Sequence, residues 1–174
     1  TRRSSDLTMT KNIAIVGSGV MGLTAAHQVA LRGARVTLYD RHRDVGRGCS
    51  WWAGGMLALW CEMESAEALI GELGLESLSY WRAHFPGVIN KGSLVVAPAR
   101  DTPDLKRFAA RTSHFEVIDG KRVAALEPDL AGRFETGLFF EKEAHLDPRE
   151  ALGFLSERLQ KEFGVRFVMD ADVR

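Results

Sequence analysis

Three glycines near the start of the chain have the spacing of a phosphate-binding turn. Gly17, Gly19 and Gly22 form a G-x-G-x-x-G pattern directly after the apolar run at residues 13–16. The first glycine permits a tight turn, the second lets a pyrophosphate approach the backbone, and the third lets a helix pack closely on a strand. Amides at the start of that helix, with its partial positive charge, would stabilise the anion. The pattern therefore predicts dinucleotide binding.

An acidic residue stands where such a site needs an acceptor for sugar hydroxyls. Asp40 follows the strand expected at residues 34–39, and its carboxylate can accept hydrogen bonds from the ribose of adenosine. The neighbouring Arg41 could favour a phosphorylated nicotinamide cofactor, but an arginine in this position is as often only solvated. Because a carboxylate repels a 2′-phosphate, Asp40 favours FAD or another unphosphorylated dinucleotide.

The elements that must position these residues follow from the periodicity. Residues 13–16 predict a buried strand, residues 20–32 a helix that ends at Gly33, and residues 34–39 a second strand parallel to the first. Near the end of the chain, a cap at Asp147 and a stop at Gly164 bound another helix, followed by a strand at residues 165–169.

The middle of the chain has a less regular pattern. Residues 62–85 predict a helix broken near Gly71 or Gly74, followed by strands at 93–97 and 115–118 and extended segments between 137 and 146. We therefore predict an α/β fold. Its Rossmann-like FAD/NAD(P)-binding layer, residues 11–56 and 147–174, is interrupted by an inserted α+β substrate-domain region at 57–146. Residues 1–10 are expected to be a disordered or non-native tail.

Composition argues against several classes of function. The 174 residues carry 23 Lys and Arg and 23 Asp and Glu, which leaves no broad basic field for nucleic acid. The two cysteines have no histidine at metal-ligand spacing, and no apolar stretch reaches the roughly 20 residues of a membrane span. We expect no nucleic-acid partner, no metal, no membrane span and a cytoplasmic location.

A glycine-aromatic segment at residues 47–56 is the second candidate for chemistry. Its sequence, RGCSWWAGGM, could lay backbone amides against a second phosphate and a flat ring. It could equally be a buried hydrophobic loop with glycine turns, and the residues alone do not separate the two. At least one of Trp51 and Trp52 is expected in the core. The histidines and cysteines have no spacing that would nominate a catalytic base or nucleophile.

Three segments together resemble the FAD-dependent amino-acid and amine oxidases of the D-amino-acid oxidase superfamily, and within it most of all the glycine oxidases of thiamine biosynthesis. They are residues 15–22, 46–56 and 145–149, and the second is much more specific than the glycine fingerprint. The resemblance covers nearly the whole chain from Met9 onward. Members of this family continue for about as long again, so the chain resembles their N-terminal half.

The resemblance implies FAD as the cofactor and names its contacts. Beyond the fingerprint glycines, it assigns Val20 and Met21 to the pyrophosphate, Asp40 and Arg41 to the ribose, and Val173 to the adenine. It also assigns Gly48, Cys49 and Ser50 to the central phosphates, and Ala53, Gly54, Gly55 and Met56 to the isoalloxazine.

The resemblance also implies a reaction. It is the oxidation of glycine or another small amino acid or amine to the imine, by hydride transfer to the flavin with dioxygen as acceptor. No catalytic residue is nominated, and a homo-oligomer stays open. The alternatives are a flavin D-amino-acid dehydrogenase that passes electrons to a quinone, and a nicotinamide-binding or non-catalytic dinucleotide module.

Overall fold

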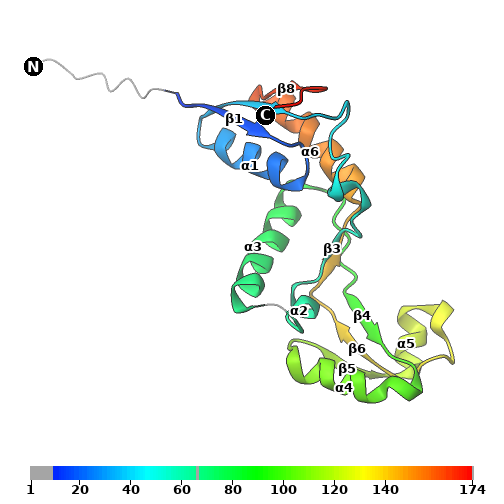
Figure 1. Cartoon of the computed structure of the whole chain (residues 1–174). Helices are drawn as coiled ribbons and strands as arrows, with labels where there is room; N and C mark the ends of the chain where they lie inside the picture. Colours follow the sequence, from blue (N-terminus) through cyan, green and yellow to red (C-terminus); the bar gives the residue numbers. More distant parts are fainter. Residues whose placement is uncertain (1–9, 66, 174) are drawn as a thin grey trace, which may run out of the picture. The chain divides into compact units, whose positions relative to one another are not determined.

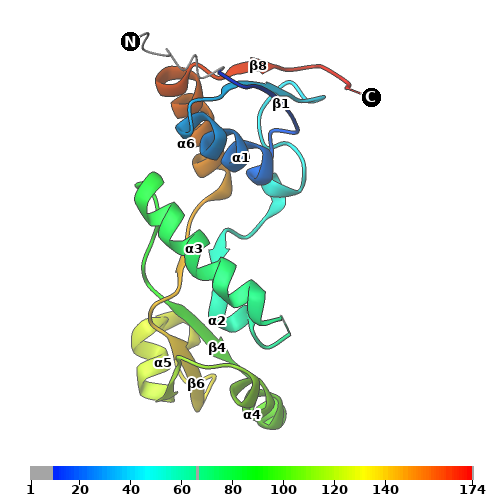
Figure 2. The same ribbon diagram turned by 90° about the vertical axis from the view of Figure 1, so that its left-hand side faces the viewer.

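The computed structural model describes residues 10–65 and 67–173, which divide into two compact units. Unit 1 comprises the described residues up to Gly54 and those from Asp147 on, and unit 2 is Gly55–Leu146. Figures 1 and 2 show both, and each is described here by itself. The tail expected at residues 1–10 lies, apart from Thr10, outside the described residues.

Unit 1 is a parallel sheet with two helices on one face. The sheet has the strand order β1-β2-β8, and the helices α1 and α6 pack side by side beneath it (Figures 1 and 2). The prediction of an α/β fold with a Rossmann-like parallel layer is confirmed. The elements are β1 (Asn12–Val16), α1 (Val20–Leu31), β2 (Arg35–Tyr39), the 3-10 turn η1 (Cys49–Trp52), α6 (Pro148–Phe163) and β8 (Arg166–Val168).

The alternation of buried and more exposed side chains along β2 explains why the helices cover one face of the sheet. Val36 and Leu38 are buried, whereas their neighbours on the strand are half-buried or exposed. Successive strand residues point to opposite faces, so these two apolar side chains share the face on which the helices pack. Leu23 of α1 and Leu159 of α6 are fully buried as well and complete this core.

The ends of α6 were predictable from its caps. The Asp147 carboxylate accepts a hydrogen bond from the amide of Arg149 at 2.8 Å and another from the amide of Glu150 at 3.4 Å. Gly164 ends the helix in the left-handed conformation, with φ of 62°. Both features satisfy backbone groups that a helix end leaves unpaired, which confirms the expected bounds.

Unit 2 is an antiparallel sheet with helices. Its three-stranded sheet has the order β4-β6-β5, and a two-stranded ladder joins β3 to β7. The core contains Leu59, Trp60, Leu78, Leu105, Leu138, Phe140 and Ala144. The elements are β3 (Met56–Leu57), α2 (Leu59–Glu62), α3 (Ala68–His84), β4 (Ser93–Val96), η2 (Ala99–Asp101), α4 (Thr102–Arg111), β5 (Glu116–Asp119), α5 (Gly120–Leu126), η3 (Pro128–Leu130), β6 (Thr136–Phe140) and β7 (Ala144–His145).

The prediction of a helix broken at Gly71 or Gly74 is wrong. Helix α3 runs through both glycines, and the interruption lies before it, between α2 and α3. A Cβ on Gly71 would stand 2.7 Å from Met63 Sδ, and one on Gly74 would stand 2.6 Å from Leu59 Cβ. The two glycines therefore let α3 pack tightly on the preceding segment and do not end a helix.

A buried carboxylate organises the start of α2. Glu143 is fully buried, and its Oε1 accepts hydrogen bonds from the amides of Trp60 and Cys61, both at 2.8 Å. Burial, reinforced by the hydrogen bond and the charge of Glu143, raises the pKa of the Cys61 thiol well above its usual range. Since the thiolate is the nucleophilic form, this shift disfavours reaction of Cys61 at neutral pH.

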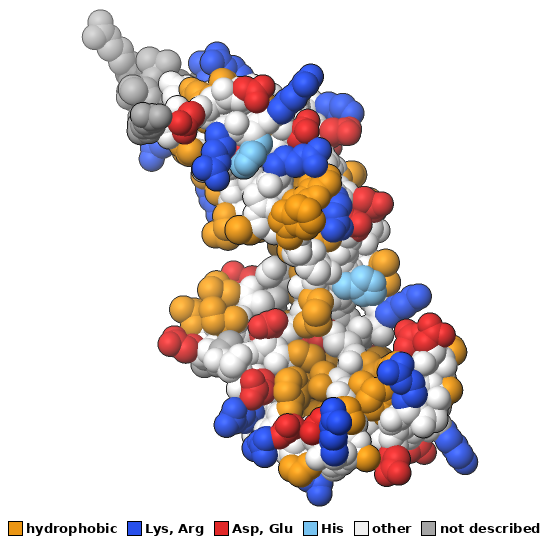
Figure 3. All heavy atoms as spheres, turned by 45° about the vertical axis from the view of Figure 1, so that its right-hand side comes forward, with side chains coloured by type: hydrophobic (Ala, Val, Ile, Leu, Met, Phe, Trp, Pro, Cys, Tyr) orange, Lys and Arg blue, Asp and Glu red, His pale blue; other side chains and the backbone are white. Residues whose placement is uncertain are grey.

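Charges of both signs mix on the surface. On the face shown in Figure 3, Lys and Arg side chains alternate with Asp and Glu, in keeping with the zero net charge. Within the described residues, no helix is long and apolar enough to cross a membrane. The same part of the chain holds no group of three or more His, Cys, Asp or Glu able to bind a metal ion.

The tight contact between α1 and the turn before it yields a first prediction. A Cβ on Gly22 would overlap the carbonyl oxygen of Gly17, a backbone atom that cannot turn away. We expect Gly22→Ala to lower the free energy of unfolding by about 1–3 kcal/mol, as overpacking does, measured by urea denaturation.

Gly153→Ala is the matched control for that substitution. It also lies inside a helix, but a Cβ there meets nothing within 4 Å. It should be neutral or stabilising by up to about 1 kcal/mol, because alanine favours helix over glycine. Equal effects of the two substitutions would contradict the close-packing role of Gly22.

Candidate functional site

The glycine fingerprint forms the turn between β1 and α1. Gly17 has a φ of +102°, a conformation that favours glycine, and its amide donates to the carbonyl of Tyr39 at 2.7 Å. Gly19 precedes the first turn of α1 and makes no side-chain capping hydrogen bond. The fingerprint turn therefore places the start of α1 directly after β1, the arrangement that suits an anion.

The glycine-aromatic loop reaches this helix start. Ser50 Oγ, in η1, accepts a hydrogen bond from the amide of Val20 at 3.0 Å. A Cβ on Gly19 would lie 3.2 Å from the same oxygen, so only glycine leaves the space between loop and helix open. The structure thus brings together the two segments that the sequence marked for phosphate binding.

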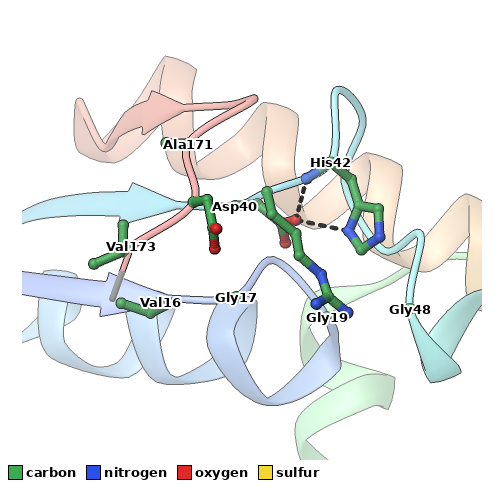
Figure 4. A pocket seen from close by; sticks show the side chains of 10 residues that line it. Val16, Gly17, Gly19, Asp40, His42, Gly48, Ala171 and Val173 are labelled. Atoms are coloured by element: carbon green, nitrogen blue, oxygen red, sulfur yellow. Dashed lines mark hydrogen bonds and ion pairs between the residues drawn. The ribbon is translucent and has the colours of Figure 1, made fainter.

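A cleft of about 360 Å³ lies at the carboxyl ends of the parallel strands (Figure 4). Open α/β sheets bind ligands at this edge, and the volume falls in the range of small-molecule sites. In Figure 4, Val16 and Val173 lie toward one end of the view and Gly48 toward the other, with Asp40 and His42 between. The lining comprises Val16, Gly17, Gly19, Asp40, Arg41, His42, Gly48, Ala171, Asp172 and Val173.

The predicted contacts divide into those that line the cleft and those that do not. The lining contains Gly17, Gly19, Asp40, Arg41, Gly48 and Val173. Outside it lie Val20, Met21 and Gly22 in α1, Cys49 and Ser50 in η1, and Ala53 and Gly54 after η1; Gly55 and Met56 belong to unit 2. Their roles toward a cofactor stay predictions.

Four lining residues were missed from the sequence: Val16, His42, Ala171 and Asp172. One of them had a local signal. His42 stands two residues after Asp40, and an aspartate carboxylate commonly accepts from the amide two residues on. The spacing of the histidines does not reveal it, because its partner is a carboxylate and not another histidine.

Asp40 is held by a network of donors at the centre of the cleft. The residue is 7% exposed, and its Oδ2 accepts from the amide and the hydroxyl of Ser18, each at 2.6 Å. Its Oδ1 accepts from the amide of His42 at 2.8 Å and lies 2.9 Å from His42 Nδ1. Burial alone would raise the pKa of Asp40, but these hydrogen bonds outweigh it and lower the pKa to about 2. The carboxylate is ionised at neutral pH.

The expectation that Trp51 or Trp52 lies in the core is wrong. Trp52 is 80% exposed, and Trp51 is half-buried. The guanidinium of Arg47 lies 4.0 Å from the centroid of the Trp51 ring, and that of Arg149 lies 5.7 Å from it. Trp51 therefore joins the loop to the start of α6 through cation–π contacts at the surface.

The family follows from comparison with known proteins. The model of the family described as FAD dependent oxidoreductase, DAO, matches residues 12–174. The chain belongs to this family. FAD is therefore the cofactor of the family to which the chain belongs.

Individual relatives support membership of the DAO family. The chain is 53% identical over 149 residues to a putative thiamine biosynthesis oxidoreductase ThiO of Rhizobium etli, covering 85% of this chain and 46% of that protein. It is 44% identical over 50 residues to a glycine oxidase of Pseudomonas aeruginosa, covering 29% of this chain and 14% of that protein. The chain thus spans less than half the length of these relatives.

The fold has a solved counterpart in the DAO family. The crystal structure of glycine oxidase from Bacillus cereus superposes with a TM-score of 0.78 over 94% of this chain and 48% of that chain, at 21% identity. At that identity the likeness shows the fold alone. It confirms the Rossmann-like layer and antiparallel sheet deduced from the topology.

The residues of the cleft fit the adenosine and diphosphate parts of FAD. A helix start with no side chain at Gly19 suits the diphosphate, and a buried ionised carboxylate at Asp40 suits ribose hydroxyls. Val16 and Val173 supply apolar contacts for a flat ring. This donor and acceptor set matches the cofactor of the family.

The Asp40 network gives a pH-dependent prediction. Because its folded pKa of about 2 lies below the ordinary 3.8, the network stabilises the fold fully above about pH 4 and loses that contribution as the pH falls toward 2. The shift is worth about 2 kcal/mol. We expect Asp40→Asn to lose that amount at pH 7, measured by urea unfolding, and to show a flatter loss of stability between pH 4 and 2.

The exposed Asp129 provides the control for the change of charge. Asp129→Asn should leave both the stability at pH 7 and its acid dependence as in the unsubstituted chain. An acid profile of Asp40→Asn that coincides with that of the unsubstituted chain would show that the network does not stabilise the fold.

Proposed function

We propose that the chain is the FAD-binding part of an enzyme that oxidises glycine or another small amino acid or amine to the imine, with dioxygen as acceptor. The observation that carries the proposal is the 53% identity, over 85% of the chain, to the ThiO relative. The relative named glycine oxidase supports the substrate class.

The cleft supports a direction for the cofactor. The proposal places the adenine beside Val173, the ribose at Asp40 and Arg41, and the diphosphate over Gly17 and Gly19. The central phosphates would be contacted by Gly48, Cys49, Ser50, Val20 and Met21. Gly22 would keep α1 close enough to present its amides. The isoalloxazine would be contacted by Ala53, Gly54, Gly55 and Met56. The cleft lining and the hydrogen bond from the Val20 amide to Ser50 Oγ support this orientation of FAD along the cleft. The flavin contacts rest on the family resemblance.

The roles of this chain in the reaction are binding and orientation. When bound, FAD supplies the redox chemistry by accepting the hydride that leaves the substrate carbon. The glycine backbone fixes the diphosphate, and Asp40 fixes the ribose, so that the reactive ring is held in one place. No acid or base of this chain is assigned to the reaction.

The proposal predicts that the space at Gly19 is essential for the cofactor. In Gly19→Val, side-chain atoms would occupy the space beside Ser50 where the diphosphate approaches. The φ of −73° is compatible with valine, so the fold should persist. We expect loss of FAD binding, measured by fluorescence titration, with an unchanged circular dichroism spectrum.

Gly153→Val serves as the control, because its Cβ meets nothing within 4 Å and Gly153 does not line the cleft. It should bind FAD as the unsubstituted chain does. Unchanged FAD affinity in Gly19→Val would show that the diphosphate lies elsewhere.

The proposed reaction can be tested with a chimera. The 174-residue chain would be joined to the part of the Rhizobium etli relative that follows the matched region, and hydrogen peroxide formed from glycine would be measured with FAD present. We expect peroxide from the chimera and none from the 174 residues alone, because substrate orientation contributes roughly 7–11 kcal/mol to lowering such barriers.

Two results would contradict the proposal. Glycine oxidation by the 174 residues alone, at the rate of the chimera, would place the whole active site within them. A folded, FAD-loaded chimera that oxidises neither glycine nor other small amines would contradict the proposed substrate class.

A further inference from the structure

We infer that the His42 imidazole competes with the ribose of a bound dinucleotide for the Asp40 carboxylate, and so limits how tightly that dinucleotide binds. The inference rests on the proposed function, in which Asp40 accepts the ribose hydroxyls. It adds a residue that sets affinity without serving as a ligand contact.

The Asp40 carboxylate can accept only a limited number of hydrogen bonds. An ionised carboxylate offers about four lone-pair positions and no donor. Ser18 fills two of them through its amide and hydroxyl, both 2.6 Å from Oδ2. His42 fills the other two through its amide, 2.8 Å from Oδ1, and its Nδ1, 2.9 Å from the same oxygen. Because the carboxylate only accepts, Nδ1 carries the hydrogen.

A ribose hydroxyl can bind to Asp40 only if one of these four donors leaves. Two of the four are backbone amides fixed by the turn after β1 and by the end of β2. The Ser18 hydroxyl belongs to a fully buried residue and also lies 3.4 Å from the amide of Gly46. Removing it would leave buried polar groups unpaired, which costs more than a lost exposed hydrogen bond.

The donor that can leave is the imidazole of His42. The His42 side chain is 37% exposed, and Figure 4 shows its ring beside Asp40 in the cleft. Turned into solvent, the ring exchanges its bond to Asp40 for bonds to water and leaves nothing buried unpaired. Dinucleotide binding therefore includes the breaking of the His42–Asp40 contact, and the measured affinity is reduced by the strength of that contact.

Two substitutions separate the donor from the rest of the side chain. His42→Ala removes the ring, whereas His42→Asn keeps an N–H near the position of Nδ1. Calorimetric titration of the 174-residue chain with ADP, at one fixed pH, should show binding roughly tenfold tighter in His42→Ala, the scale of one hydrogen bond to a charged group. His42→Asn should bind ADP as the unsubstituted chain does.

A change of ligand and a second substitution test the route of the effect. With 2′,3′-dideoxy-ADP, which has no ribose hydroxyls, His42→Ala should bind no tighter than the unsubstituted chain. In the Asp40→Ala background the gain from His42→Ala should vanish, because the two residues act through one contact. Thermal unfolding of each variant shows that it is folded.

The outcomes distinguish this inference from the proposed function. Weaker or unchanged ADP binding in His42→Ala, or a gain that persists with the dideoxy ligand, overturns the competition. Two other results would instead contradict the proposed ribose site. One is that the unsubstituted chain binds neither ADP nor FAD. The other is that Asp40→Ala binds ADP as tightly as the unsubstituted chain does.

Discussion

Within unit 1, one buried carboxylate holds together the segments that form the cleft. Asp40 follows β2, and its oxygens accept from Ser18 in the turn after β1 and from His42 in the segment that follows β2. A buried charge without partners would cost several kcal/mol, so the folded unit keeps these donors converged on it. The main chain of Asp40 extends the link, because its carbonyl accepts from the amide of Ala171 at 2.9 Å. Asp40 therefore links the turn after β1, the segment after β2 and the segment after β8, all of which line the cleft.

The glycines of the chain act in two different ways around this carboxylate. Gly17 is needed for its positive φ, which turns the chain from β1 toward α1. Gly22 is needed for the absence of a side chain, because α1 passes directly over the carbonyl of Gly17. The same absence serves unit 2, where Gly74 admits the side chain of Leu59. A glycine in a helical pattern is thus as consistent with a close approach as with a break.

This difference decides what could be predicted from the sequence. The strands around the fingerprint and the ends of α6 have local signals, namely alternation, a cap at Asp147 and a left-handed stop at Gly164, and they were predicted correctly. The unbroken α3 depends on contacts with residues that precede it, which periodicity does not contain. In the site, Asp40 was identifiable because it ends a strand. Ala171 lines the cleft because β8 pairs with β2 and because its amide donates to the Asp40 carbonyl, and no local pattern marks it.

The chemistry of the cleft explains why the cofactor is easier to infer from the fold than the substrate is. Its lining offers glycine backbone, small apolar side chains, the carboxylates of Asp40 and Asp172, and the side chains of Arg41 and His42. These groups suit phosphate, sugar and a flat ring. In the proposed placement these groups face the adenosine and diphosphate of FAD, which are the same whatever is oxidised, so none of them distinguishes glycine from another amine. Proteins that share this fold can therefore bind the same cofactor, and other residues must select the substrate. In the proposed placement of FAD, the position two residues beyond Asp40 is one place where a substitution can change how tightly the cofactor is held.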